Sequence, residues 1–293
     1  MDSTILFLPE LILIASILAV PAIYIATNST KSCSICSNIS LAVSLLVVIL
    51  FWYSPDSVSF DKSSSSYVIY DHFVINDFSQ LFKVIFLLSA LAVSIISSSY
   101  FKEDEPHQAE YYVLLLSSAL GMLITASAND FLTIFVGIEL SAFSSYGLVA
   151  FRKTDDKSTE AGAKYLLIGA FSSALTLYGI SLLYALTGSV TFEGVNAFLT
   201  GINNGVIDGD FNELIFISSL FIIAGLGFKI AVVPFHAWAP DVYEGAPTPV
   251  TALLAAASKA MGFVALFKVF IFTLEPFSDE WSLVLGIIAL VSM

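Results

Sequence analysis

The sequence predicts an all-α polytopic membrane protein, a helical bundle in which one helix is broken. Of the 293 residues, 57% are hydrophobic and 12% are charged, whereas soluble domains carry about 25% charged residues. Apolar runs of the ~20 residues that cross a hydrocarbon layer recur along the chain. The stretch Phe228–Lys259 adds lysines, acids and prolines to such an apolar region, which predicts a break between Lys229 and Pro234.

The apolar runs give the expected membrane helices in order, and each complete run approaches the length that spans a bilayer. The runs are Ile5–Thr27, Ile35–Tyr53, Phe78–Tyr100, Tyr111–Ala128, Phe131–Phe151, Gly162–Thr187, Glu213–Val233 and Thr248–Leu274. Long polar connections are expected at Ser54–Asp77 and Gly188–Asn212, and a tight antiparallel hairpin at Asn129–Asp130. An incomplete ninth helix begins near Trp281, and we expect the chain to be truncated at Met293.

Lysine and arginine in the connecting loops predict the orientation, because cytoplasmic loops carry an excess of both. One set of alternate loops carries Lys31, Lys102, Arg152, Lys153 and Lys157, and the other set carries Lys62. We therefore expect the N-terminus outside a prokaryotic cell membrane, with the loop Arg152–Glu160 and the segment Pro234–Gly245 towards the cytoplasm. The net charge of −13 argues against a nucleic-acid partner, which requires a basic face.

Glu139 is a candidate functional residue because it lies near the middle of the run Phe131–Phe151. A charge at the bilayer centre costs at least ~2.5–3.5 kcal/mol, and ionisable residues at such depths are functional by default. The alternative is a protonated or hydrogen-bonded core acid, with Ser141, Ser144 or Ser145 as its partner.

Lys164 and Lys259 are further candidates. Lys259 lies among small residues, which favours helix packing over lipid contact; the alternative is a structural lysine paired with one acid. Lys164 lies only a few residues into its run, so snorkelling of its ammonium to the cytoplasmic face is the alternative to a functional role. Lys83 and Lys268 lie close to helix ends, and we expect both to snorkel and to be structural.

Lys229 is the residue best suited to relay a proton. It lies five residues before Pro234, which removes a backbone donor and clashes with a carbonyl one turn earlier. Carbonyls freed by the break can face water or a cation, so the lysine is expected beside an aqueous cavity. His236, within the broken segment, is a candidate for proton transfer, with a polar cap for the broken backbone as the alternative. Trp238 and Tyr243 are expected at the membrane interface.

Cys33 and Cys36 form a lone Cys-Ser-Ile-Cys pattern. A structural zinc needs about four ligands, so we expect no metal and interpret the pair as small residues in a polar turn. The sequence has no cysteine cluster for iron–sulfur, no paired histidines for haem and no GxGxxG for a dinucleotide. We therefore expect no cofactor on this chain and assign the redox chemistry that drives transport to partner subunits.

The residues FKIAVVPFHAWAPDVYEGAPTPVTALLAAASK resemble the signature of the proton-translocating, antiporter-like membrane subunits of respiratory complex I. The form DVYEGAPTPV is similar to that of the N subunit, the mitochondrial ND-two type. NDFLTIFVGIELSAFSSYGLVAF and AGAKYLLIGAFSSALTLYG resemble the fifth and sixth helices of the same subunit. The likeness covers most of Asp77–Phe270.

This resemblance implies a fold of roughly fourteen helices with two inverted five-helix repeats, each with a broken helix of the kind that builds transport sites. Residues 1–110 would then hold three preceding helices, 111–274 the first translocation repeat, and 275–293 the start of a truncated ninth helix. The second repeat is expected beyond Met293. The resemblance also implies that Glu139 pairs with Lys164 and tunes Lys229, and that Lys259 passes the proton along a hydrated axis.

The function implied is proton translocation in the membrane arm of a complex I-like oxidoreductase. The donor would be NAD(P)H, reduced deazaflavin or ferredoxin, the acceptor a quinone or phenazine, and the partners other membrane-arm subunits, redox subunits and the lipid bilayer. The nearest alternative is a subunit of a multisubunit sodium/proton antiporter or membrane-bound hydrogenase. A standalone solute symporter is a distant alternative, because Phe228–Pro234 offers a lysine and little else to coordinate a substrate.

Overall fold

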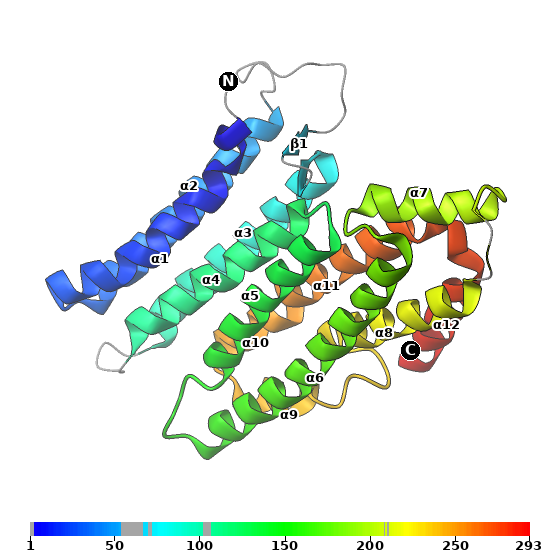
Figure 1. The fold of residues 1–293 in the computed structure, drawn as a ribbon. Helices are drawn as coiled ribbons and strands as arrows, with labels where there is room; N and C mark the ends of the chain where they lie inside the picture. The colour runs from blue at the N-terminus through cyan, green and yellow to red at the C-terminus, as the bar shows by residue number, and fades with distance from the viewer. Residues whose placement is uncertain (1–2, 54–66, 70–71, 102–106, 208, 210) are drawn as a thin grey trace.

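The computed structural model describes residues 3–53, 67–69, 72–101, 107–207, 209 and 211–293, and its ribbon is a bundle of long helices (Figure 1). Eight helical stretches among these residues are long and apolar enough to cross a membrane. They are α1 (Leu8–Thr27) with the preceding turn η1 (Ser3–Phe7), α2 (Thr30–Tyr53), α3 (Asp77–Tyr100), α4 (Gln108–Ser127), α5 (Phe131–Val149), α6 (Asp156–Thr187), α8 (Asn212–Ile230) and the composite helix Thr248–Thr273. The predicted membrane helices are therefore confirmed, and the chain is a multi-pass membrane protein.

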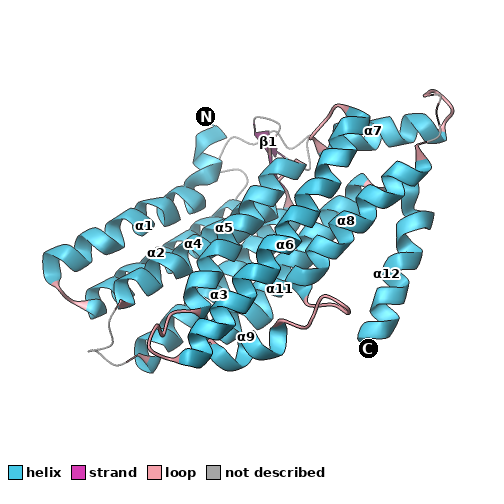
Figure 2. Cartoon of the chain, turned by 60° about the horizontal axis from the view of Figure 1, so that its bottom comes forward, coloured by secondary structure: helices cyan, strands magenta, loops and turns pink. Residues whose placement is uncertain are grey.

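The composite helix consists of α10 (Thr248–Leu253), the π-helical segment η3 (Leu254–Ser258), α11 (Lys259–Leu266) and the π-helical segment η4 (Phe267–Thr273). After it come η5 (Glu275–Phe277) and α12 (Ser278–Ser292), which accounts for the expected ninth helix. Figure 2 shows α1 and α2 at one side of the bundle and α12 at the other. α4 is central, with 72% of its apolar window buried inside the protein.

Two of the predicted helices begin at least five residues earlier than expected. α2 begins at Thr30, so Cys33 and Cys36 lie in its first turns and not in a polar turn. α6 begins at Asp156, six residues before Gly162, because the Asp155 side chain caps it by accepting a hydrogen bond from the backbone N–H of residue 157. Its 32 residues extend for about 48 Å, which exceeds the hydrocarbon thickness, so its first turns project beyond the apolar layer.

The two long connections contain regular structure that the sequence analysis missed. In the first, β1 (Tyr67–Ile69) and β2 (Phe73–Ile75) form a two-stranded antiparallel hairpin. In the second, α7 (Phe192–Asn203) lies across the ends of neighbouring helices (Figure 1). It is amphipathic, with Phe192, Val195 and Leu199 buried on one face. At 12 residues it is too short to span a membrane, so a search for spanning runs does not detect it.

α4 and α5 approach each other closely through glycines. A Cβ atom added at Gly121 would lie 2.6 Å from the carbonyl oxygen of Gly137 and 2.6 Å from the backbone nitrogen of Ser141. Small residues let helix backbones approach in a membrane, where packing drives association. This contact fixes α5, and with it Glu139, against the centre of the bundle.

The predicted broken helix is confirmed, and α8 ends at Ile230, three residues before the expected end. Ala231 takes the left-handed conformation with φ of 58° and donates its N–H to the Phe228 carbonyl at 3.0 Å. The chain then passes the exposed Pro234 and forms the short helix α9 (Ala239–Gly245). The helix cannot continue to Val233 because the proline ring occupies the space of a helical turn.

Candidate functional site

Glu139 and Lys229 lie in the wall of one small cavity between α5, α6 and α8. The wall also includes the hydroxyl residues Ser172, Ser173 and Thr176. The cavity leaves about 20 Å³ for the centre of a water molecule, which is enough for one water. The side-chain oxygen Oε1 of Glu139 accepts a hydrogen bond of 2.5 Å from the Ser173 hydroxyl. An acid, a base and hydroxyl groups therefore surround a space of molecular size.

Lys229 occupies the last turn of α8, directly before the break. It is 4% exposed, and its ammonium nitrogen Nζ makes no hydrogen bond. Gly225, one turn earlier, lies where α8 closely approaches α6. Its carbonyl accepts a 2.7 Å hydrogen bond from the Ser172 hydroxyl of α6. A Cβ atom at Gly225 would clash with the Thr176 hydroxyl. The glycine thus brings the buried lysine next to the polar face of α6.

Lys259 begins α11, immediately after the π-helical segment η3. Its ammonium lies 5.5 Å from the centre of the Tyr243 ring, within cation–π range. Gly262, one turn further along, lets α11 pack against α8, since an added Cβ would lie 3.4 Å from the Lys229 Cβ atom. The structure therefore brings Glu139, Lys229 and Lys259 to one region, and π-helical segments often occur at functional sites.

An aromatic group packs at the broken helix, and its member Tyr165 was not predicted from the sequence. The ring of Tyr165, from α6, is 0% exposed and stacks on Trp238 with centroids 4.7 Å apart. Trp238 is 2% exposed and donates its indole N–H to the carbonyl of Phe228 at 3.1 Å. The indole thus adds a second hydrogen bond to a carbonyl at the end of the broken helix, and the expected interfacial depth of Trp238 stays a prediction.

Lys164 does not contact Glu139 in the described structure. Its ammonium lies 2.6 Å from the Asp241 carboxylate of α9 and 2.7 Å from Glu160, and its side chain is 43% exposed. Ser173, the partner of Glu139, lies nine positions further along α6, or about 13 Å. The expected Glu139–Lys164 pair is therefore absent, because about two and a half turns of α6 separate Lys164 from the residue that Glu139 contacts.

The contact of Lys164 predicts a specific chemical cross-link. A water-soluble carbodiimide joins an amine to a carboxylate that it already touches, so we expect a link between Lys164 and Asp241 in the purified native protein. Mass spectrometry with fragment ions locates the link, and Asp241→Asn is expected to abolish it. The neighbouring pair Lys157–Glu244, also 2.6 Å apart, provides an internal positive control. A link from Lys164 to Glu139 would contradict this geometry.

His236 is exposed in the segment between α8 and α9, and it does not line the cavity of Glu139 and Lys229. Cys33 is buried and Cys36 is partly buried, and both are free thiols. Within the described ranges, no group of three or more His, Cys, Asp or Glu side chains is placed to hold a metal ion.

Lys83 and Lys268 do not snorkel, contrary to expectation. Lys83 is 1% exposed, and its ammonium lies 2.7 Å from the Glu10 carboxylate of α1, which is buried as well. Lys268 is 4% exposed and donates hydrogen bonds of 2.6 Å to the carbonyls of Ala126 and Ala128 at the end of α4. Both ammonium groups find partners inside the bundle, so neither needs to reach the interface. A structural role for both lysines stays a prediction.

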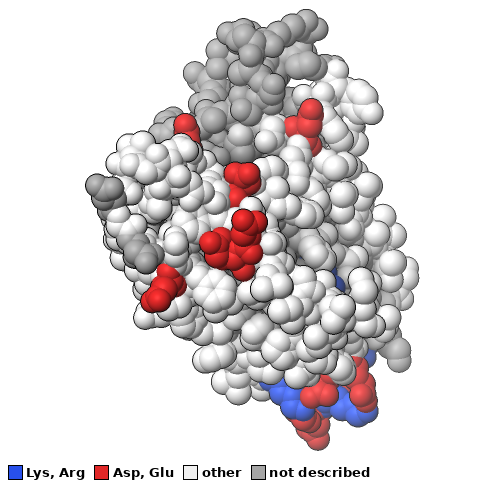
Figure 3. Space-filling model, turned by 90° about the vertical axis from the view of Figure 1, so that its right-hand side faces the viewer, with Lys and Arg blue, Asp and Glu red and all other residues white. Residues whose placement is uncertain are grey.

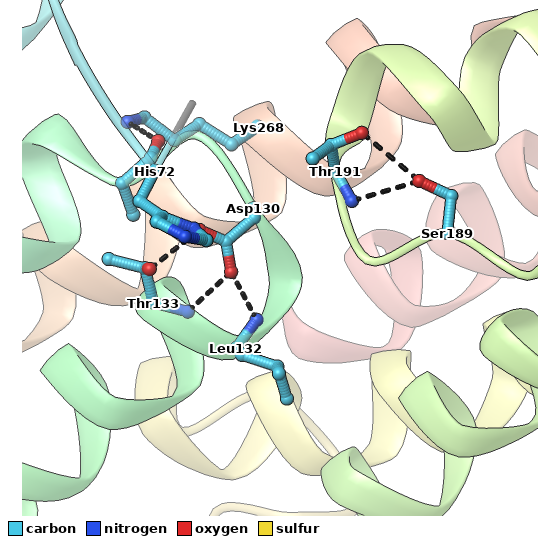
Figure 4. Close-up of polar contacts among 8 residues, drawn as sticks. His72, Asp130, Leu132, Thr133, Ser189, Thr191 and Lys268 are labelled. Atoms are coloured by element: carbon cyan, nitrogen blue, oxygen red, sulfur yellow. Dashed lines mark hydrogen bonds and ion pairs between the residues drawn. The ribbon is translucent and has the colours of Figure 1, made fainter. Parts of the chain in front are cut away.

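The turn between α4 and α5 is held by a buried aspartate. Asp130 is the N-cap of α5 and accepts hydrogen bonds from the backbone N–H groups of Leu132 and Thr133 and from the Thr133 hydroxyl. His72 contacts the same carboxylate at 2.9 Å, and Lys268 bonds the nearby end of α4 (Figure 4). The predicted tight hairpin is confirmed, and these contacts fix the end of α5 from which Glu139 projects two turns later.

The spanning helices, the broken helix and the buried lysine beside it define a polytopic membrane protein of the antiporter-like class. Residues 128–293 match the family described as NADH:quinone oxidoreductase/Mrp antiporter, TM, and the chain belongs to this family. It is 37% identical over 288 residues to "F(420)H(2) dehydrogenase subunit N" of Methanosarcina mazei, covering 97% of this chain and 56% of that protein. It is 46% identical over 196 residues to "NADH-quinone oxidoreductase subunit N" of Desulfitobacterium hafniense, covering 67% and 38%.

Solved structures agree with this assignment. A chain of respiratory complex I from Thermus thermophilus superimposes with a TM-score of 0.72 and 28% identity, covering 89% of this chain and 53% of that chain. A chain of the Mrp complex from Dietzia has a TM-score of 0.74 at 18% identity, covering 94% and 50%, which shows the shared fold. The chain thus spans about half the length of the curated relatives it matches.

Proposed function

We propose that this chain translocates protons in the membrane arm of a complex I-like, redox-driven oxidoreductase. The observation that carries the proposal is the buried Lys229, whose ammonium has no hydrogen-bond partner and shares a water-sized cavity with Glu139 at a helix break. Intramembrane ionisable residues of this kind mark ion paths and proton relays. Relatives named as subunit N of two oxidoreductases support this function over that of a sodium/proton antiporter.

The cavity supports a loading and unloading cycle for the proton. A carboxylate close to a buried amine favours the ammonium form, and burial without that carboxylate favours the neutral amine. Glu139 holds its carboxylate against Ser173 at the wall of the cavity, so a shift of α5 against α6 changes its separation from Lys229. The proton released from Lys229 is then taken up by Lys259 on α11. Lys164 acts separately, by holding α9 against the start of α6.

The orientation proposed for the chain follows the distribution of charge. Figure 3 shows most of the visible Lys and Arg gathered with acidic residues at the lower end, where α6 begins and α9 lies in Figure 1, while the patches of charge higher on this face are acidic. We assign this end to the cytoplasm and the N-terminus to the outside. Lys62 and Lys102, which also entered the expected orientation, lie outside the described residues. We assign the electron-transfer chemistry to partner subunits, in a prokaryotic cell membrane.

Lys229→Met tests the proposed function, because methionine keeps the length of the side chain and removes its protonation site. In the complete complex reconstituted in liposomes, we expect proton pumping per electron to fall by about tenfold or more. The measurement is the quenching of a pH-sensitive dye alongside donor oxidation. The matched control is Lys157→Met, which removes an exposed lysine. Pumping at the wild-type level in Lys229→Met would refute the proposal.

A further inference from the structure

The carbonyl of Phe228 ties the broken helix to the segment that follows it. This carbonyl accepts two hydrogen bonds, one from the backbone N–H of Ala231 at 3.0 Å and one from the indole N–H of Trp238 at 3.1 Å. The last carbonyls of an α-helix have no N–H partner within the helix, so bonds of this kind close the end of α8. The second donor lies ten positions away along the chain and is 2% exposed. Trp238 therefore holds the last turn of α8 from outside that helix.

Phe228 connects this hydrogen bond to the candidate site. Its side chain lines the cavity that contains Glu139 and Lys229, and its carbonyl group forms the peptide bond to Lys229. The ring of Phe228 also packs against the indole of Trp238, with centroids 5.0 Å apart. The indole thus contacts both the backbone from which Lys229 projects and a ring in the cavity wall.

Trp238 is held in turn by α6 and α9. Its indole stacks on the ring of Tyr165 in α6, with centroids 4.7 Å apart and 18° between the ring planes, and Trp238 is the N-cap residue of α9. α9 packs tightly on α6, since a Cβ atom added at Gly245 would lie 2.5 Å from a backbone carbonyl of α6. The ion pair between Lys164 and Asp241 joins the same two helices. The indole is therefore the point at which α6, α8 and α9 meet.

The indole N–H does more than satisfy a buried carbonyl. Ala231 already donates a hydrogen bond to the Phe228 carbonyl, and one partner is enough for a buried polar group. A phenylalanine ring at position 238 could still stack on Tyr165, but it has no N–H to donate. What the tryptophan adds is a second donor, which fixes the direction of the carbonyl and hence the backbone next to Lys229.

We propose that Trp238 is a positioning residue for proton transfer, whose hydrogen bond to the Phe228 carbonyl holds Lys229 at its working separation from Glu139. This inference rests on the proposed function and names the residue that sets its geometry. The attraction between a carboxylate and an ammonium depends on their separation, so a small movement of the end of α8 changes how firmly the lysine holds its proton. The indole N–H only donates and carries no transported proton, so Trp238 acts through Lys229.

Trp238→Phe tests the inference, because it keeps an aromatic ring and removes the N–H donor. In the complete complex reconstituted in liposomes, we expect the pH profile of pumping per electron to shift by about half a pH unit, since one hydrogen bond has a free energy of that size. Such a shift lowers pumping by about threefold on the steep part of the profile. The matched control is Trp281→Phe, because the Trp281 indole donates a 2.8 Å hydrogen bond to the Leu274 carbonyl, at the end of another helix. We expect it to keep the wild-type profile.

Two further variants separate the hydrogen bond from the packing of the ring. Incorporation of 3-benzothienylalanine at position 238 keeps the size of the bicyclic ring and replaces its N–H by sulfur, and we expect the same shift as in Trp238→Phe. The second variant combines Trp238→Phe with Glu139→Gln. Because the carboxylate is then absent, we expect the residual pumping to show the same pH profile as Glu139→Gln alone.

The outcomes separate this inference from the proposed function. A wild-type pH profile in both position-238 variants, with pumping lost in Lys229→Met, overturns the positioning role and leaves the proposed function intact. Wild-type pumping in Lys229→Met overturns both. Less assembled complex with an unchanged profile assigns Trp238 a structural role and overturns the inference, as does a shift that persists in the Glu139→Gln background. A shift in both position-238 variants that is absent from Trp281→Phe and from the Glu139→Gln background supports it.

Discussion

Lys83→Met is expected to destabilise the protein by about 3–5 kcal/mol, because it leaves one partner of a buried ion pair without the other. The ammonium of Lys83 and the carboxylate of Glu10 lie 2.7 Å apart, with their side chains 2% and 7% exposed. Removing the lysine strands a carboxylate between α1 and α3 in a medium of low dielectric constant. The measurement is the free energy of unfolding, followed by thermal denaturation of the purified protein in detergent.

The double variant Glu10→Leu with Lys83→Met is the matched control. It removes both charges and replaces them with apolar side chains, a change that is often neutral or stabilising for buried pairs. We expect it to recover most of the lost stability. If the double variant is as unstable as Lys83→Met, then mutual neutralisation is not the role of this pair, and the packing of the lysine stem explains the loss.

Lys83 and Lys268 also show where depth counting along a sequence stops working. Both lie close enough to helix ends for snorkelling. The sequence around each lysine indicates only its distance from the helix end, and that distance predicts an ammonium at the interface. Their partners come from elsewhere: Glu10 from α1, and the carbonyls at the end of α4, more than 100 positions before Lys268. A lysine that finds such partners inside the bundle stays there, and a single sequence without tertiary contacts does not reveal them.

The break in α8 and the position of Glu139 were predictable because their signals are local. Pro234 follows a lysine within an apolar run, and the physics of a proline inside a helix does not depend on the rest of the fold. Glu139 lies near the middle of a run bounded by clear polar residues, so its depth follows from helix geometry. The cavity that joins Glu139 to Lys229 required the packing of three helices.

The partner of Lys164 was not predictable by the same means. The polar residues 156–161 suggest a loop, but Asp155 caps a helix that includes them, and α6 becomes longer than the membrane requires. Lys164 contacts Asp241 of α9, which lies 77 positions later in the sequence, and a contact of that range depends on the packing of α9 against α6. Tyr165 was missed for a related reason. One tyrosine in an apolar run forms no recognisable pattern, and its burial depends on the segment after the helix break, whose Trp238 packs against it.

Glu139→Gln is expected to lower proton pumping by about tenfold or more in the full complex. Glutamine keeps the size of the side chain and an oxygen that accepts the hydrogen bond of Ser173, which is 2.5 Å long in the wild type. Only the ionisable carboxylate is lost, and with it the charge that favours protonation of the nearby lysine. The measurement is proton pumping per electron in liposomes, beside the rate of electron transfer.

Ser173→Ala separates the charge of Glu139 from its position. It removes the hydrogen bond and leaves the carboxylate. A hydrogen bond to a charged group contributes about 1.5–3 kcal/mol of free energy. A water molecule in the cavity can replace much of that contribution by bonding the carboxylate itself. We therefore expect Ser173→Ala to reduce pumping less than Glu139→Gln does. If Ser173→Ala abolishes pumping while Glu139→Gln retains it, the carboxylate does not control the protonation of Lys229. The hydroxyl groups that α6 places in the cavity wall would then conduct the proton.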